Sequence, residues 1–146
     1  MAEPRSAGDA VPRAPDSGRS MQKIYFISRV SISAIWFYHG LVPKIIYGND
    51  QEVLMNNALA PFAAERLALL LSGLSEIIMA ILCLVLYRNR FLAKLTALFA
   101  VAMTIALALT LPTLFQNAFN PFTLNLALVA LAAINVASNK SMVEPA

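Results

Sequence analysis

Among the polar side chains inside the apolar stretches of this sequence, four could carry chemistry. His39 and Lys44 fall in one stretch, Glu76 in a second and Asn125 in a third. Ionisable groups with apolar neighbours need a partner or a proton, so they mark candidate functional sites. Such groups can exchange protons or bind the polar oxygens of a small amphipathic molecule. Trp36, three residues before His39, would supply an apolar wall.

Helical spacing allows these residues to face the interior of one bundle. With a rise of about 1.5 Å per residue, Glu76 lies about 15 Å below the outer end of its helix, near the midplane. His39 and Lys44 lie within about 10 Å of the outer end of theirs, and Asn125 about one turn inside. The helical stripes are Trp36, Gly40, Pro43 and Lys44; Ser72, Glu76, Met79 and Cys83; and Asn125, Leu128, Ala132 and Asn135. We expect a polar pocket that opens outward.

Each polar residue also has a purely structural interpretation. Glu76 could bond a neighbouring helix, although we favour a pocket-lining role, and for His39 a bond to a backbone carbonyl stays open. We expect Lys44 and Arg29 to snorkel toward the outer and inner headgroups. Asn125 is expected to serve helix packing more than ligand contact.

The residue inventory excludes several kinds of site. One His, one Cys and one deep Glu cannot build a four-ligand zinc site, and a single His cannot hold a bis-His haem. No apolar span holds an Asp for a Ser-His-Asp triad, and no Gly-rich phosphate loop is present. The inventory suits a quinone headgroup between Trp36, His39 and Glu76, or a proton-coupled step, with no covalent cofactor and no metal.

The elements that must position these residues are membrane helices. Only 13% of the 146 residues are charged, about half the roughly 25% of soluble domains, and the mean hydropathy is +0.67. Spans of about 20 apolar residues can cross a bilayer. They occur at residues 24–46, 66–87, 91–113 and 122–138. The sequence therefore predicts an all-α bundle of four transmembrane helices.

Basic residues set the predicted orientation. They flank the spans and form no patch with interleaved aromatics, which excludes nucleic acid as a partner. One side carries Arg5, Arg13, Arg19, Lys23, Arg88, Arg90, Lys94 and Lys140, and the other Lys44 and Arg66. The positive-inside rule places both termini in the cytoplasm.

The connecting and terminal segments complete this prediction. The link at residues 88–90 is so short that the helices it joins must be antiparallel neighbours. The outer link at residues 47–65 has room for a short helix capped by Asn49 or Asp50 and ending before Pro61. We expect residues 1–20 to be a disordered tail, with Met1 and Met21 both open as the functional start, and residues 21–140 to form the domain before a tail at 141–146.

Three segments together resemble the DoxX-like family of small bacterial membrane proteins. They are Trp36-Phe-Tyr-His-Gly-Leu-Val-Pro-Lys44, Gly73-Leu-Ser-Glu76 and Asn120-Pro-Phe-Thr-Leu-Asn125, and the resemblance covers about residues 21–138. It implies a four-helix bundle in the inner membrane and a link to quinone-dependent oxidoreductase complexes. The family's polar motif residues would fall on His39, Lys44, Glu76 and Asn125. Without a nucleotide-binding domain or a second Cys, the chain is expected to be an accessory subunit.

The leading hypothesis is an inner-membrane subunit that binds quinone or a similar amphiphile and serves a redox partner. Glu76 and His39 are the candidate catalytic residues, Lys44 would attract anionic groups, and Trp36 and Asn125 complete the candidate ligand-binding set. One alternative is a non-catalytic assembly or tethering protein in the lipid bilayer. Another is a small transporter formed as a homo-oligomer, ranked last because the inner half between Met79 and Tyr87 looks nearly apolar.

Overall fold

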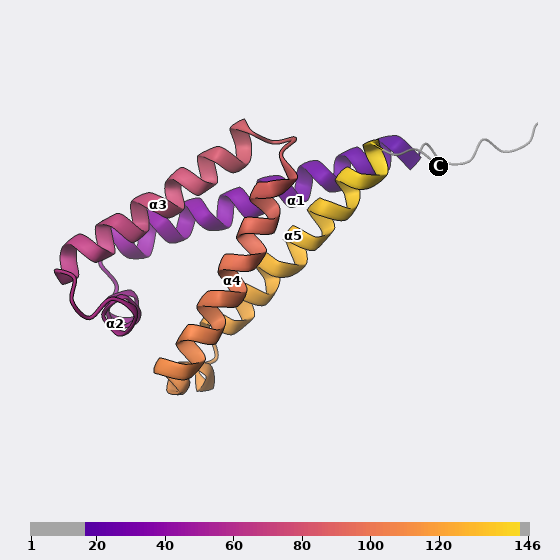
Figure 1. Ribbon diagram of the computed structural model, residues 1–146. Helices are drawn as coiled ribbons and strands as arrows, with labels where there is room; N and C mark the ends of the chain where they lie inside the picture. The colour runs from indigo at the N-terminus through magenta and orange to yellow at the C-terminus, as the bar shows by residue number, and fades with distance from the viewer. Residues whose placement is uncertain (1–16, 144–146) are drawn as a thin grey trace, which may run out of the picture.

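The computed structural model describes residues 17–143, and over this range it contains helices and no strand (Figure 1). The predicted all-α class is therefore confirmed. The elements are α1 (Ser17–His39), the π-helix η1 (Gly40–Ile46), α2 (Asp50–Leu59), α3 (Glu65–Val85), α4 (Arg90–Thr110), the short 3-10 helix η2 (Pro112–Gln116) and α5 (Pro121–Val143).

The long helices pack in the spatial order α3, α1, α5, α4. α1 packs against α3 on one side and α5 on the other, and α5 packs against α4. α3 and α4 run away from their short link in different directions (Figure 1) and touch little. The predicted neighbours at this link are therefore joined but not packed along their length, because α1 and α5 form the centre of the bundle.

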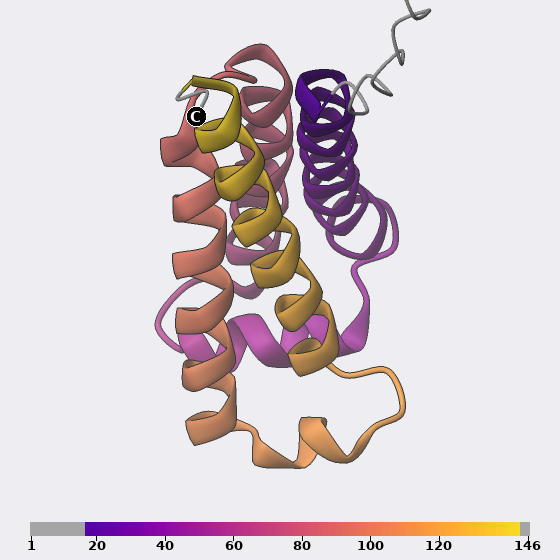
Figure 2. The ribbon, with the colours of Figure 1, turned by 90° about the vertical axis from the view of Figure 1, so that its right-hand side faces the viewer.

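α2 crosses one end of the bundle, opposite the described ends of the chain (Figure 2). It contacts both α3 and α4, and so bridges the two helices that diverge. The side chain of Asn49 caps α2 by accepting a hydrogen bond from the Gln51 N–H at 2.9 Å. The predicted short helix, its cap and its end before Pro61 are confirmed. We call this end of the molecule the α2 end.

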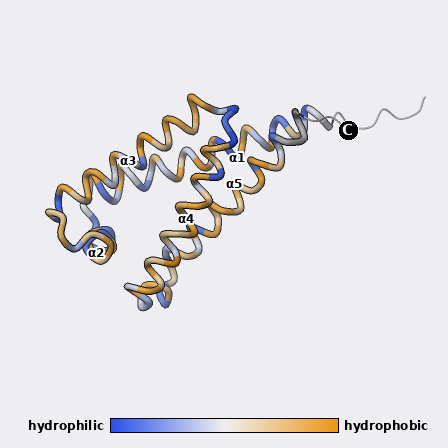
Figure 3. Tube along the Cα trace, viewed as in Figure 1, coloured by the Kyte–Doolittle hydropathy of each residue, from blue (hydrophilic) through white to orange (hydrophobic). Residues whose placement is uncertain are grey.

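Three of the described helices are long and apolar enough to cross a membrane: Glu65–Val85, Arg90–Thr110 and Pro121–Asn139. Hydrophobic residues run along all three (Figure 3). The other predicted span, residues 24–46, is divided between α1 and η1 and is not among them. Ser28, Arg29 and Ser33 lower the mean hydropathy of this segment. The count of four spans therefore stays a prediction.

The helix ends extend beyond the predicted boundaries. α1 begins at Ser17, so residues 17–20 of the predicted tail are helical, because Met21, Gln22 and Lys23 favour helix and extend it backward. α5 continues to Val143, into the segment predicted as a C-terminal tail. The remaining parts of the two predicted tails, residues 1–16 and 144–146, lie outside the described residues.

The last turns of the first long helix widen at a proline. Pro43 has no N–H to donate, and in an α-helix its ring would clash with the carbonyl four residues back; the wider π-helix relieves that clash. The Tyr47 N–H donates to the Val42 carbonyl, five residues back, at 3.1 Å. Gly48, with φ of 55°, then turns the chain into α2.

Arg29 does not snorkel, contrary to the prediction. It is 1% exposed, and Nε donates to the Cys83 carbonyl at 2.8 Å. Nη2 donates to the carbonyls of Leu86 and Asn89 at 2.9 and 3.1 Å. The last carbonyls of a helix attract a cation. Arg29 therefore binds the C-terminal end of α3 and the link to α4.

Asn135 extends this buried network to α5. Its Oδ1 accepts from Arg29 Nη1 at 3.3 Å, and its Nδ2 donates to the Tyr25 carbonyl at 3.1 Å and the Ser28 hydroxyl at 3.0 Å. Ser33 donates to the Ala80 carbonyl at 2.7 Å. The half of the bundle predicted to face the cytoplasm is consequently not the nearly apolar region that we predicted.

Candidate functional site

A cavity of about 570 Å³ lies at the α2 end of the bundle, lined by residues of α1, η1, α2, α3, α4, η2 and α5. All five predicted ligand-binding residues line it: Trp36, His39, Lys44, Glu76 and Asn125. Aromatic and aliphatic side chains, among them Phe99, Met103 and Leu128, form much of the wall. The five predicted residues thus share one cavity in the structure. Their role in binding stays a prediction.

The crossing of two glycines positions the charged part of the cavity. A Cβ on Gly73 of α3 would lie 2.7 Å from the Gly40 carbonyl oxygen and 3.1 Å from the Lys44 Cβ. The two backbones approach this closely because neither residue has a side chain. Lys44 and Glu76, four and three residues further along, are thereby brought together.

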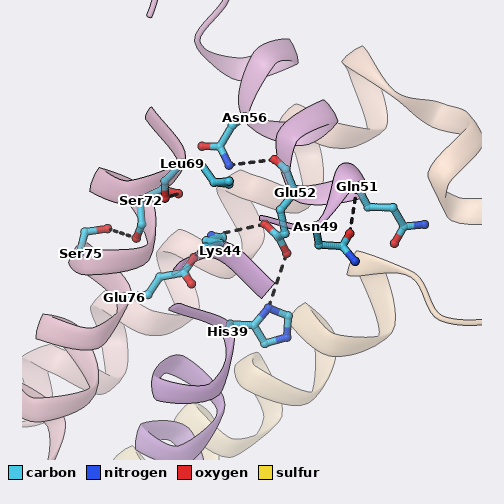
Figure 4. Close-up of polar contacts among 10 residues, drawn as sticks. All are labelled: His39, Lys44, Asn49, Gln51, Glu52, Asn56, Leu69, Ser72, Ser75 and Glu76. Carbon is cyan, nitrogen blue, oxygen red and sulfur yellow. Dashed lines mark hydrogen bonds and ion pairs between the residues drawn. The ribbon is translucent and has the colours of Figure 1, made fainter. Parts of the chain in front are cut away.

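Lys44 lies between two carboxylates (Figure 4). Its Nζ forms an ion pair with Glu76 Oε1 and lies 3.5 Å from Glu52 Oε2. Lys44 and Glu52 are each 8% exposed, and Glu76 is 9% exposed. Lys44 therefore does not snorkel, which corrects the prediction, because two buried acids offer its ammonium closer partners than the headgroups do.

His39 forms the edge of the same cluster. Its Nδ1 lies 3.9 Å from Glu52 Oε1, and its side chain is 32% exposed. With both glutamates ionised and His39 neutral, two carboxylates would face one ammonium, which gives a net charge of one negative unit. Lys44 is already compensated, which argues against its predicted role of attracting anionic groups.

Glu52 is the residue that sequence reasoning missed. It stands three residues after the cap Asn49, the position of the acid in a capping box, which is a local structural role. In the structure the Asn49 N–H donates to the Pro43 carbonyl at 2.7 Å, so the Glu52 carboxylate is free to face Lys44 and His39. The cue available in the sequence was an acid on a short helix that had to cover one end of the bundle.

Trp36 and Asn125 join helices as well as lining the cavity. Trp36 Nε1 donates to the Thr96 hydroxyl at 3.2 Å, and its ring lies 5.4 Å from that of Phe99. Asn125 Nδ2 donates to the Thr104 hydroxyl at 3.0 Å, linking α5 to α4. This bond agrees with the predicted packing role of Asn125, and its role in ligand contact stays a prediction. Over residues 17–143, no group of three His, Cys, Asp or Glu side chains is arranged to hold a metal ion.

Comparison with known families finds a match. The sequence model of the DoxX-like family matches residues 33–133, which run from α1 through the cavity-lining segments into α5. Neither a curated protein nor a solved structure matches this sequence. The apolar helices α3, α4 and α5 together with the family match make it a membrane protein. The match extends over more than half of the 146 residues, and the chain belongs to the DoxX-like family.

Proposed function

We propose that this protein is a multi-pass protein of the bacterial inner membrane that binds a quinone, or a similar amphipathic molecule, in the cavity at the α2 end. In this proposal it is an accessory subunit for an oxidoreductase partner rather than a complete enzyme. The observation that carries the proposal is the cavity itself, about 570 Å³ in volume, with apolar walls and a buried cluster of charges. Sites for small molecules combine these features.

The residues divide between the two parts of such a ligand. Trp36 and Phe99 offer flat apolar surface to a ring, and Met103 and Leu128 continue it. Glu76 and His39 would bind or exchange protons with the ring oxygens. His39 is the partly exposed member of the cluster, which suits it to pass protons between Glu52 and water.

The membrane arrangement that supports this role has four spans, with α1 as the fourth. α1 buries Arg29 and Ser33 against its neighbours but exposes large apolar side chains, including Phe26, Ile27 and Phe37. Such a helix fits a bilayer because its polar groups are bonded inside the bundle. With the basic link between α3 and α4 in the cytoplasm, the cavity lies in the outer half.

Fluorescence of Trp36, the single Trp of the chain, provides the test. A short-chain quinone titrated into the purified protein is expected to quench this fluorescence saturably. Glu76→Gln and His39→Ala should each change the affinity about tenfold or more, the effect of gaining or losing a hydrogen bond at a buried polar group. Ser75→Ala is the matched control, since Ser75 is exposed on the same helix. Native mass spectrometry after gentle extraction should find a bound quinone.

The outcome that contradicts the proposal is a protein that arrives empty and shows no saturable quenching. It would favour a non-catalytic assembly or tethering protein. One observation supports that second candidate: the bonds of Trp36 to Thr96, Asn125 to Thr104 and Lys44 to Glu76 all join different elements. In that case Glu76→Gln would lower stability without changing the binding of any small molecule.

A further inference from the structure

The Glu76 carboxylate has one engaged oxygen and one free oxygen. Oε1 forms the ion pair with Lys44, whereas Oε2 is buried and has no hydrogen-bond partner among the described residues. The residue is 9% exposed and lines the cavity. A buried acceptor without a donor is costly, so this oxygen is where a ligand has most to offer.

Glu52 provides a contrast within the same cluster. Its Oε2 lies 3.5 Å from the Lys44 ammonium, and its Oε1 lies 3.9 Å from His39 Nδ1. Both oxygens of Glu52 therefore already face nitrogen atoms of the protein. Of the carboxylate oxygens in this cluster, Glu76 Oε2 is the one that is buried without a hydrogen-bond partner.

The hydrogen-bonding capacity of Glu76 Oε2 determines which ligand groups it can bind. A carboxylate paired with an ammonium has only acceptor atoms. A quinone carbonyl is also only an acceptor, so it would place two acceptors against each other at Oε2. With both glutamates ionised, the net negative charge of the cluster also disfavours an anionic head. A hydroxyl group supplies the missing donor and adds no negative charge.

We propose that the cavity prefers the reduced, hydroxylated form of its ligand, a quinol whose hydroxyl donates a hydrogen bond to Glu76 Oε2. This inference rests on the proposed function, which places a quinone-type molecule in the cavity. It adds which redox form is held more tightly and which atom distinguishes the two forms.

Isothermal titration calorimetry under anaerobic conditions tests this preference. The probes are a short-chain benzoquinone, its quinol and the dimethyl ether of that quinol, each added to the full-length protein in detergent. The quinol should bind about tenfold or more tightly than the other two, the effect of one hydrogen bond to a charged group. The ether keeps the ring and both oxygens but has no donor.

Two variants that each replace one carboxylate by an amide show which glutamate causes the preference for quinol. Glu76→Gln should reduce the preference for quinol to about one, whereas Glu52→Gln should retain it. An unchanged preference in Glu76→Gln would overturn the inference. If that variant does not fold, the three probes on the wild-type protein still decide.

The remaining outcomes separate this inference from the proposed function. Equal binding of all three probes, or tighter binding of the quinone, overturns the preference for quinol and leaves the proposed function in place. Equal binding would mean that water satisfies Oε2. Binding of none of the three overturns the proposed function, and this inference with it.

Discussion

Gly40 and Gly73 lie against each other where η1 crosses α3, and the carbonyl oxygen of each occupies the space that a side chain on the other would need. A Cβ at Gly40 would also lie 3.0 Å from the Glu76 Cβ. The crossing is therefore the structural basis of the buried pair between Lys44 and Glu76, and it depends on two residues without side chains.

Gly40→Ala is expected to push η1 and α3 apart where they cross. The added methyl group meets backbone, which cannot rotate away, so we expect destabilisation of about 2 kcal/mol or more, typical of overpacking. Thermal unfolding in detergent, followed by circular dichroism, measures the change. Gly18→Ala is the control, because a Cβ there meets nothing within 4 Å. Equal stability of the two variants would show that the crossing is not close-packed.

Lys44→Met is expected to destabilise the protein strongly. It leaves the buried carboxylates of Glu52 and Glu76 without their cation, and breaking a buried pair on one side costs about 3 kcal/mol or more. The double variant Lys44→Met with Glu76→Leu should recover part of this loss, because only the Glu52 carboxylate is then left without its cation. Unfolding of the single and double variants gives the coupling energy. Lys94→Met, at an exposed position on α4, is the matched control and should change little.

Much of the candidate site was predictable, because the depth of a residue in its span and its face on the helix both follow from its position in the sequence. The spacing of Trp36 and Lys44, the depth of Glu76 and the position of Asn125 placed four side chains toward one interior, and all four line the cavity. The short helix after Gly48 was predictable from its cap. These features depend on local sequence and not on which helix packs against which.

Partner choice was not predictable in the same way. The side chain of a basic residue near a helix end can reach the headgroups or turn into the bundle. Its position along the predicted span is the same in both cases. Arg29 turns inward because the free carbonyls at the end of α3 lie beside it. Lys44 does so because Glu52, from a separate helix, covers it. Both outcomes depend on helix packing, which no single-sequence pattern contains.

Cysteine labelling tests the count of spans and their orientation. In a Cys83→Ala background, Ser20→Cys, Phe62→Cys and Phe119→Cys each add one exposed thiol. With four spans and cytoplasmic termini, an impermeant maleimide should label Phe62→Cys and Phe119→Cys in spheroplasts, and Ser20→Cys only after lysis. If α1 does not cross, Ser20→Cys and Phe62→Cys will label on the same side.

Arg29→Leu should loosen the end of the bundle opposite α2. It removes the donor from the carbonyls of Cys83, Leu86 and Asn89, and buried acceptors left without a donor cost about 1 to 3 kcal/mol each. We expect a total loss of about 3 kcal/mol or more, and faster hydrogen exchange in the last turn of α3. Arg66→Leu, at an exposed position on the same helix, is the control.

Arg29→Lys distinguishes geometry from charge at this position. A lysine keeps the positive charge, but its single ammonium cannot reproduce the planar fork that contacts three carbonyls and the Asn135 side chain. It should therefore recover less than half of the stability lost in Arg29→Leu, and exchange at the end of α3 should stay fast. Full recovery would mean that the attraction between a cation and the end of α3 is sufficient, and that the fork contributes nothing of its own.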